Sequence, residues 1–111
     1  VATMEDLDTI VRTTFGFRLG FFGPFAIADQ AGLDVYANCF VTFEEAYGQR
    51  LATPKLLTDT VSQGRKGVKN NEGLLGDYDD ETREALIAYR NKAYARMNQL
   101  IAELGPAPKA K

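Results

Sequence analysis

Apolar residues recur at intervals of three and four along most of this chain, the spacing of helices that bury one face. The pattern predicts five helices, over residues 3–15, 24–31, 35–47, 54–61 and 81–104. No segment alternates apolar and polar residues in the manner of a half-buried strand. We therefore expect an all-α fold, a compact helical domain of about five helices.

Residues typical of helix ends flank several of these segments. Thr3 is placed to cap the first helix, and Asp34 to cap the third. Gly23-Pro24 is typical of a helix start, because proline is tolerated at the first helical position. Gly32 stands where a helix ends in a left-handed residue. Thr53-Pro54 repeats the pairing of a cap with a proline, and residues 16–23 are expected to form a turn with buried side chains.

Two helices carry broad apolar faces. The aromatic stripe of the third helix indicates core or a subunit interface rather than a cofactor site; it consists of Tyr36, Phe40, Phe43 and Tyr47. The last helix carries a wider stripe that must cover something; its members are Leu86, Ile87, Tyr89, Ala93, Tyr94, Met97, Leu100, Ile101 and Leu104. Gly105-Pro106 stops this helix, and residues 105–111 are expected to form a frayed tail.

Four carboxylates, Asp77, Asp79, Asp80 and Glu81, crowd the start of the last helix. Such a cluster can bind a metal, but negative charge also stabilises a helix N-terminus. We interpret these residues as capping groups and expect no metal site.

Composition excludes several classes of function. A net charge of −2 argues against nucleic-acid binding, which needs a basic face, and no window approaches a membrane span. Cys39 is the only cysteine, so it forms no internal disulfide, and we expect a buried core thiol and a cytoplasmic location. The absence of histidine leaves the chain without the commonest general base.

Residues 64–76 are rich in glycine, lysine and asparagine, which indicates a loop. The short basic run of Arg65, Lys66 and Lys69 is interpreted as solvated. The loop matches neither glycine-rich phosphate-binding pattern, so we do not expect it to bind phosphate.

Two blocks resemble a known family. Gly23-Pro24-Phe25, Ala28-Asp29 and Gly32-Leu33-Asp34 look like the signature of the C-terminal domain of 3-hydroxyacyl-CoA dehydrogenases. A second glycine-rich block, residues 64–75, follows in the order and at the spacing that the family shows. The resemblance covers residues 1–78, which leaves residues 79–104 as an additional helix within a single helical domain of residues 1–111.

The resemblance implies a helical domain like the C-terminal domain of 6-phosphogluconate dehydrogenase. It also implies a homodimer and a parent enzyme that oxidises acyl-CoA substrates with NAD in fatty acid or related acyl-CoA metabolism. The Gly23-Pro24-Phe25 turn matches the part of the family domain that lines the acyl end of the substrate cleft. The catalytic His–Glu pair and the NAD site belong to a Rossmann domain that this sequence does not contain. We therefore expect a fragment without a catalytic, cofactor or metal site of its own.

The second block departs from the family pattern. Asn70 and Asn71 replace a threonine and a glycine, and Leu74-Leu75 replace an aromatic pair. Asn71 still suits a left-handed backbone, but the lost aromatic anchors leave the packing of this loop and the substrate range open.

Two other functions stay open at this stage. One is a stand-alone helical interaction module, which the helix over residues 81–104 favours. The other is a related dehydrogenase that acts on a small hydroxy acid without CoA.

Overall fold

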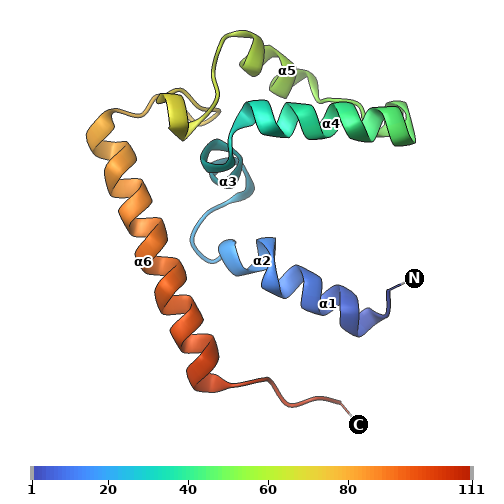
Figure 1. The fold of residues 1–111 in the computed structure, drawn as a ribbon, viewed down its shortest axis with the longest axis vertical. Coiled ribbons are helices and arrows are strands. Elements are labelled where there is room, and N and C mark those ends of the chain that lie inside the picture. Colours follow the sequence, from blue (N-terminus) through green and yellow to red (C-terminus); the bar gives the residue numbers. More distant parts are fainter. Residues whose placement is uncertain (1, 111) are drawn as a thin grey trace.

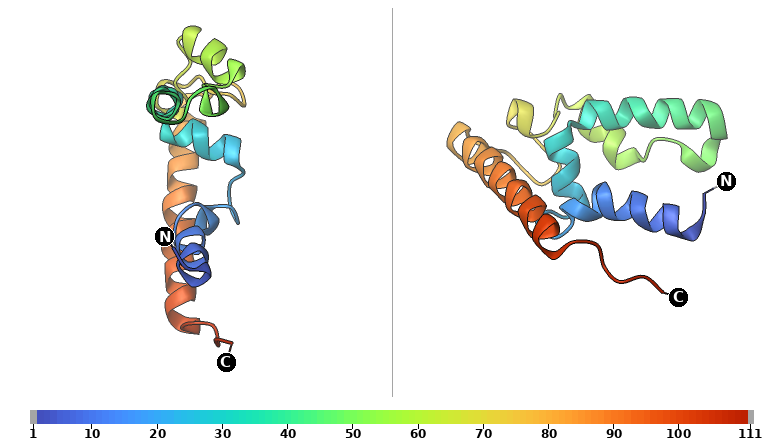
Figure 2. Two further views of the ribbon diagram at one scale, coloured as in Figure 1. Left: turned by 90° about the vertical axis from the view of Figure 1, so that its right-hand side faces the viewer. Right: turned by 60° about the horizontal axis from the view of Figure 1, so that its bottom comes forward.

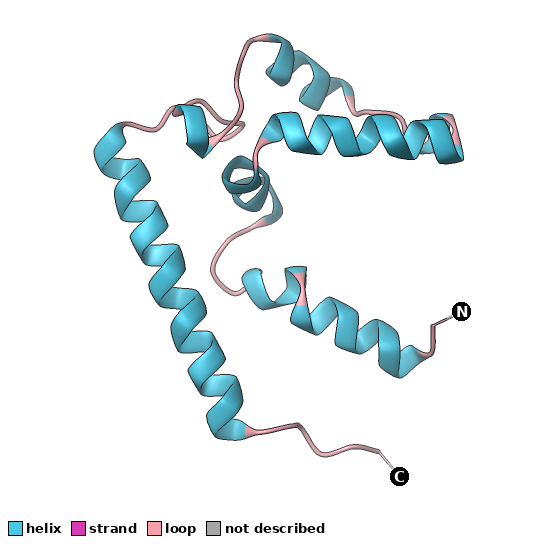
Figure 3. Ribbon diagram, viewed as in Figure 1, coloured by secondary structure: helices cyan, strands magenta, loops and turns pink. Residues whose placement is uncertain are grey.

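The computed structural model describes residues 2–110, and within that range every regular element is helical (Figures 1 and 3). The elements are α1 (Met4–Thr13), α2 (Phe15–Arg18), α3 (Pro24–Ala31), α4 (Leu33–Tyr47), the 3-10 turn η1 (Gln49–Leu51), α5 (Lys55–Ser62), the 3-10 turn η2 (Val68–Asn70) and α6 (Asp80–Leu104). The all-α prediction is confirmed. The expected turn over residues 16–23 instead begins within the short helix α2.

The described chain is flat and open rather than compact. It measures 51 × 41 × 14 Å and has a radius of gyration of 17.1 Å, where a compact chain of this length has about 13 Å. Helix α6 forms one long arm, and the other helices project from it within a thin slab (Figures 1 and 2). The accessible surface of 8314 Å² exceeds the roughly 6,000 Å² of a compact monomer of this mass.

The small core lies where α3, α4 and α5 meet. Leu33 is fully buried there and packs with Ala28 and Leu57. Side chains from α4, α5 and the loop before α6 complete the cluster; they are Tyr36, Ala37, Phe40, Val61 and Leu74. The aromatic stripe of α4 is thus divided, because Tyr36 and Phe40 pack on the core whereas Phe43 and Tyr47 are exposed.

A second cluster, of aromatic rings, joins α6 to α2 and to the segment that follows it. Tyr94 of α6 packs edge-to-face on Phe17, with ring centroids 5.4 Å apart, and also contacts Phe21 and Phe22. Phe22 packs in the same manner on Tyr89, at 5.8 Å. These contacts hold the middle of α6, but no residue of this helix is buried.

Most of the predicted helix ends are confirmed. Thr3 forms a capping box with Asp6, and Asp79 accepts a hydrogen bond of 2.7 Å from the Thr82 backbone N–H at the start of α6. Gly32 has a φ of 107°, and Asn71 takes the left-handed conformation with a φ of 65°. Positive φ values at Gly48 and Gly105 likewise end α4 and α6.

Three local predictions were wrong. Gly32 directly precedes α4, so Asp34 lies in the first turn instead of capping it and pairs with Lys69. Pro54 occupies the cap position of α5, and Thr53 does not cap that helix. Cys39 is exposed, because it lies on a face of α4 that the α3–α5 corner leaves uncovered.

Candidate functional site

The two sequence blocks meet in space at one buried side chain, Asp29 of α3. The residue is completely inaccessible to solvent. Its carboxylate accepts hydrogen bonds from the backbone N–H of Leu74 at 2.6 Å and of Leu75 at 3.2 Å, and from the Tyr78 hydroxyl at 2.7 Å. A buried carboxylate is costly unless its oxygens are satisfied, and these three donors satisfy it. Asp29 therefore fixes the second block against α3.

Two glycines allow this close approach. A Cβ on Gly67 would lie 2.1 Å from the backbone oxygen of Asp29, and Gly67 has a φ of 105°. A Cβ on Gly73 would lie 2.4 Å from the Asp29 carboxylate. Backbone therefore packs directly on Asp29 from two sides, and no larger side chain fits at either position.

The loop over residues 64–78 is also held by its own side chains. The prediction that its basic run is solvated holds for Lys66 and Lys69, which are exposed, but not for Arg65. The half-buried Arg65 donates to the Gly73 carbonyl at 3.0 Å and to the Asp77 carboxylate at 2.6 Å. Lys69 pairs with Asp34 at 2.6 Å. The Asn70 side chain accepts from the Lys66 N–H and donates to the Gly64 carbonyl. These bonds hold the loop together and tie it to the first turn of α4.

These contacts shift the pKa values of two groups, Tyr78 and Asp34. Burial raises the pKa of Tyr78 to about 12, and the neighbouring Asp29 carboxylate acts in the same direction. The pKa of Asp34 lies below its ordinary value, chiefly because its carboxylate accepts a hydrogen bond from Lys69.

The Gly23-Pro24-Phe25 turn, predicted to bind substrate, lies at the start of α3. Gly23 occupies the cap position with an ordinary φ of −71°, and Pro24 is the first helical residue. A Cβ on Gly23 would meet nothing within 4 Å, and the Phe25 side chain is 57% exposed. The turn therefore presents open backbone and an exposed ring, while Asp29 anchors the same helix about one turn further on.

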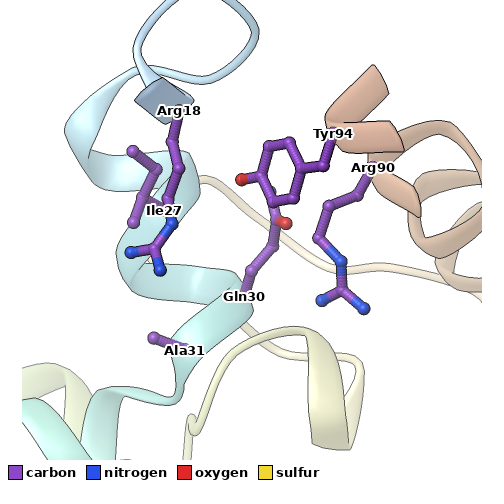
Figure 4. Close-up of a pocket in the computed structure, with 6 residues that line it drawn as sticks. All are labelled: Arg18, Ile27, Gln30, Ala31, Arg90 and Tyr94. Atoms are coloured by element: carbon purple, nitrogen blue, oxygen red, sulfur yellow. The ribbon is translucent and has the colours of Figure 1, made fainter. Parts of the chain in front are cut away.

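A groove between α3 and α6 is lined by Arg18, Ile27, Gln30, Ala31, Arg90 and Tyr94, and has a volume of about 250 Å³. Figure 4 shows Arg18 and Arg90 on opposite sides of this groove, with Gln30 and Tyr94 between them. Only Tyr94 was named from the sequence, as part of the apolar stripe of α6, because the tertiary fold brings three separate segments together here.

Residues 2–110 bring no three metal-ligating side chains together. The carboxylates near α6 are engaged instead: Asp79 caps the helix, Asp77 pairs with Arg65, and Asp80 lies beside Asn71 and Arg83. In the same range, no helix combines the length and the apolar character needed to cross a membrane.

Several known proteins are similar to this chain. Residues 1–77 match the family model of the 3-hydroxyacyl-CoA dehydrogenase C-terminal domain. A 5-formyl-3-hydroxy-2-methylpyridine 4-carboxylate 5-dehydrogenase of Mesorhizobium japonicum is 29% identical over 87% of this chain and 31% of its own length. The fatty acid oxidation complex subunit alpha of Shewanella oneidensis is 34% identical over 65% of this chain and 10% of its own length.

A solved structure agrees with these matches. The 3-hydroxyacyl-CoA dehydrogenase of Archaeoglobus fulgidus superposes with a TM-score of 0.69 and 26% identity, over 94% of this chain and 34% of that one. The chain thus spans about a third or less of the length of these relatives. It belongs to the family of the 3-hydroxyacyl-CoA dehydrogenase C-terminal domain.

Proposed function

We propose that this chain is the dimerisation and substrate-cleft domain of an NAD-dependent 3-hydroxyacyl-CoA dehydrogenase-like oxidoreductase, active in fatty acid or related acyl-CoA metabolism. The observation that carries the proposal is the family match over residues 1–77, together with the bacterial and archaeal dehydrogenases that are about three times longer than this chain.

Pairing of two copies is supported by the surplus of surface. The described chain exposes roughly 2,000 Å² more than a compact monomer of its mass, and obligate dimers bury surface of this order. The exposed surface includes large apolar side chains of three helices; they are Leu7, Ile10 and Val11 of α1, Val41, Phe43 and Tyr47 of α4, and Leu100, Ile101 and Leu104 of α6. Exposed apolar side chains in this number indicate surface that an interface covers.

The missing Cβ of Gly23 and the exposed ring of Phe25 support a role for the Gly23-Pro24-Phe25 turn in the substrate cleft. Neither packing nor backbone conformation within this chain requires a glycine at position 23. A position without a Cβ is useful where another molecule approaches the backbone closely, and the exposed Phe25 ring offers an apolar wall beside it. We assign the acyl end of the substrate to this turn.

The residues of this chain do not fit NAD. Rossmann-type sites hold the pyrophosphate on a glycine-rich loop between a strand and a helix, and residues 2–110 form neither a strand nor that loop. NAD binding and the proton transfer are therefore assigned to the rest of the parent enzyme. The Asp29 contacts instead keep the cleft-forming helix and the glycine loop in one rigid unit.

A small hydroxy acid without CoA is a second candidate substrate. The Mesorhizobium japonicum relative, whose name specifies a pyridine carboxylate, aligns with 87% of this chain. The helix over residues 81–104 no longer favours a stand-alone interaction module. The archaeal dehydrogenase covers 94% of the chain, so its match includes most of α6.

The parent enzyme tests the proposal directly. NADH formation is measured with 3-hydroxyacyl-CoA substrates and with free hydroxy acids, for the natural enzyme and for Gly23→Val. We expect turnover of an acyl-CoA and a raised KM in the variant, with unchanged NAD affinity. Turnover of free hydroxy acids alone would establish the second candidate, and absence of any NAD-dependent oxidation would refute both.

A further inference from the structure

We propose that the groove between α3 and α6 is a binding site for the carboxylate or phosphate group of a small organic anion, held between Arg18 and Arg90. Arg18 ends α2, and Arg90 lies in the middle of α6. Both line the same groove of about 250 Å³ together with Gln30 and Tyr94 (Figure 4). The proposal does not depend on the dehydrogenase activity or on pairing of the chain.

The two arginines of the groove carry positive charge that no carboxylate of the described chain balances. Within residues 2–110, neither Arg18 nor Arg90 lies within ion-pair distance of a carboxylate, whereas Arg65, Lys69 and Arg83 all do. Arg90 makes only a long hydrogen bond of 3.4 Å, to the side chain of its neighbour Asn91. Two arginines that line one groove without a counter-ion create a positive field, which an oxyanion would neutralise.

The groove also contains a hydrogen-bond donor without a partner, the side-chain amide of Gln30. The side-chain nitrogen of Gln30 is buried and has no partner. Buried polar atoms are normally paired, so an exception needs a physical account. Gln30 lines the groove between the two arginines, and a rotation of its side chain would let this nitrogen donate to an oxyanion held there. The charge and the orphaned donor thus point to the same ligand.

The remaining lining sets the class of ligand. Ile27 and Ala31, one helical turn apart on α3, supply an apolar floor, and the Tyr94 ring adds an aromatic wall. A guanidinium binds carboxylate or phosphate through two parallel N–H donors. The groove is smaller than typical pockets for drug-sized ligands, which begin at about 300 Å³. It therefore suits a compact anion with one apolar side better than a dinucleotide.

The aromatic cluster gives the site a fixed shape. Tyr94 lies one turn after Arg90 on α6 and packs on Phe17, the residue before Arg18. This contact ties the segment that carries one arginine to the helix that carries the other. Helix α6 thus has a role in this chain beyond extending the domain, because without it the groove loses Arg90 and Tyr94.

Nuclear magnetic resonance titration of the ¹⁵N-labelled 111-residue chain tests the proposal. The probes are benzoate, its neutral isostere benzamide, and inorganic phosphate. We expect saturable shifts at the Gln30 side-chain amide and around Tyr94 with benzoate or phosphate and none with benzamide. The tighter of the two anions identifies the group, since benzoate reports a carboxylate and phosphate a phosphoryl ligand.

Three variants make the test specific. Arg18→Gln and Arg90→Gln should each weaken anion binding by about tenfold, the size of one lost charge-assisted contact. Arg96→Gln removes the same charge from α6 outside the groove and should leave the affinity unchanged, with circular dichroism verifying that all three fold. Equal binding of benzamide, shifts scattered over surface lysines, or equal losses in Arg96→Gln would each overturn the proposal.

Discussion

The Tyr78 hydroxyl donates to the Asp29 carboxylate at 2.7 Å across 49 residues of sequence. This bond, with the two backbone bonds from Leu74 and Leu75, joins the first glycine-containing block to the second. The domain has few buried apolar side chains, so a single polar residue carries an unusual share of its tertiary structure.

Replacing Asp29 by asparagine should lower the free energy of unfolding by about 2–3 kcal/mol. The change keeps the volume but removes a charged acceptor from three donors, and hydrogen bonds to charged groups contribute about 1.5–3 kcal/mol. Urea denaturation followed by circular dichroism measures the loss. Asp59→Asn is the matched control, because Asp59 pairs with Lys55 on the surface and exposed pairs contribute about 1 kcal/mol or less. Equal losses in the two variants would contradict the role assigned to Asp29.

Tyr78 should ionise at a pH above the ordinary value for a tyrosine. Its pKa is raised to about 12, above its ordinary value, so the folded state holds the proton more tightly than the unfolded state. This contribution to stability is complete below pH 10 and is lost as the pH rises from 10 towards 12. Ultraviolet absorbance of tyrosinate in the folded chain should show one late step, which Tyr78→Phe removes. A late step that survives in this variant would belong to another tyrosine.

Asp34 should contribute stability that depends on acid pH. Lys69 holds the pKa of this carboxyl below its ordinary value, so the contribution is present above the unfolded pKa and is lost as the pH falls through the lower folded value. Lys69→Met should therefore flatten the acid limb of the stability profile between pH 5 and pH 2, an interval set by ordinary carboxyl values of about 4. An unchanged acid limb would show that the Lys69–Asp34 pair does not contribute to the free energy of unfolding.

Two glycine variants should differ in how much stability they lose. Gly67→Ala puts a Cβ against the Asp29 backbone at a positive φ and should cost at least about 2 kcal/mol from backbone strain and overpacking. Gly23→Ala meets open space, so its cost should be limited to the weaker capping by alanine at the start of α3, about 1 kcal/mol or less. Thermal unfolding of both variants measures the difference. A large loss in Gly23→Ala would mean that this glycine serves the fold rather than a ligand.

Local signals predicted the helices and their ends well. Thr3 and Asp79 cap the helices that their neighbours in sequence indicate, and Gly32 and Asn71 take the conformations that their types favour. These features depend on residues a few positions apart, where propensity and capping chemistry act directly.

Long-range features escaped the sequence analysis. In the sequence, Asp29 is one polar residue within an apolar helical segment. Its partners lie 45–49 residues away, so no local pattern predicts the contacts. The Arg18–Arg90 groove likewise requires α2, α3 and α6 to meet. The expectation of a compact domain, and of a buried Cys39, assumed that this chain covers its own apolar faces. The open shape shows that it leaves much of α1, α4 and α6 uncovered.

The mass of the chain in solution tests the proposed pairing function most directly. Light scattering across a dilution series should give twice the monomer mass of 12.2 kDa down to low micromolar concentration, and Ile101→Glu on the exposed face of α6 should shift the species to the monomer. Glu103→Gln on the same helix is the control that leaves the mass unchanged. A folded monomer at all concentrations would contradict a pairing surface within these helices.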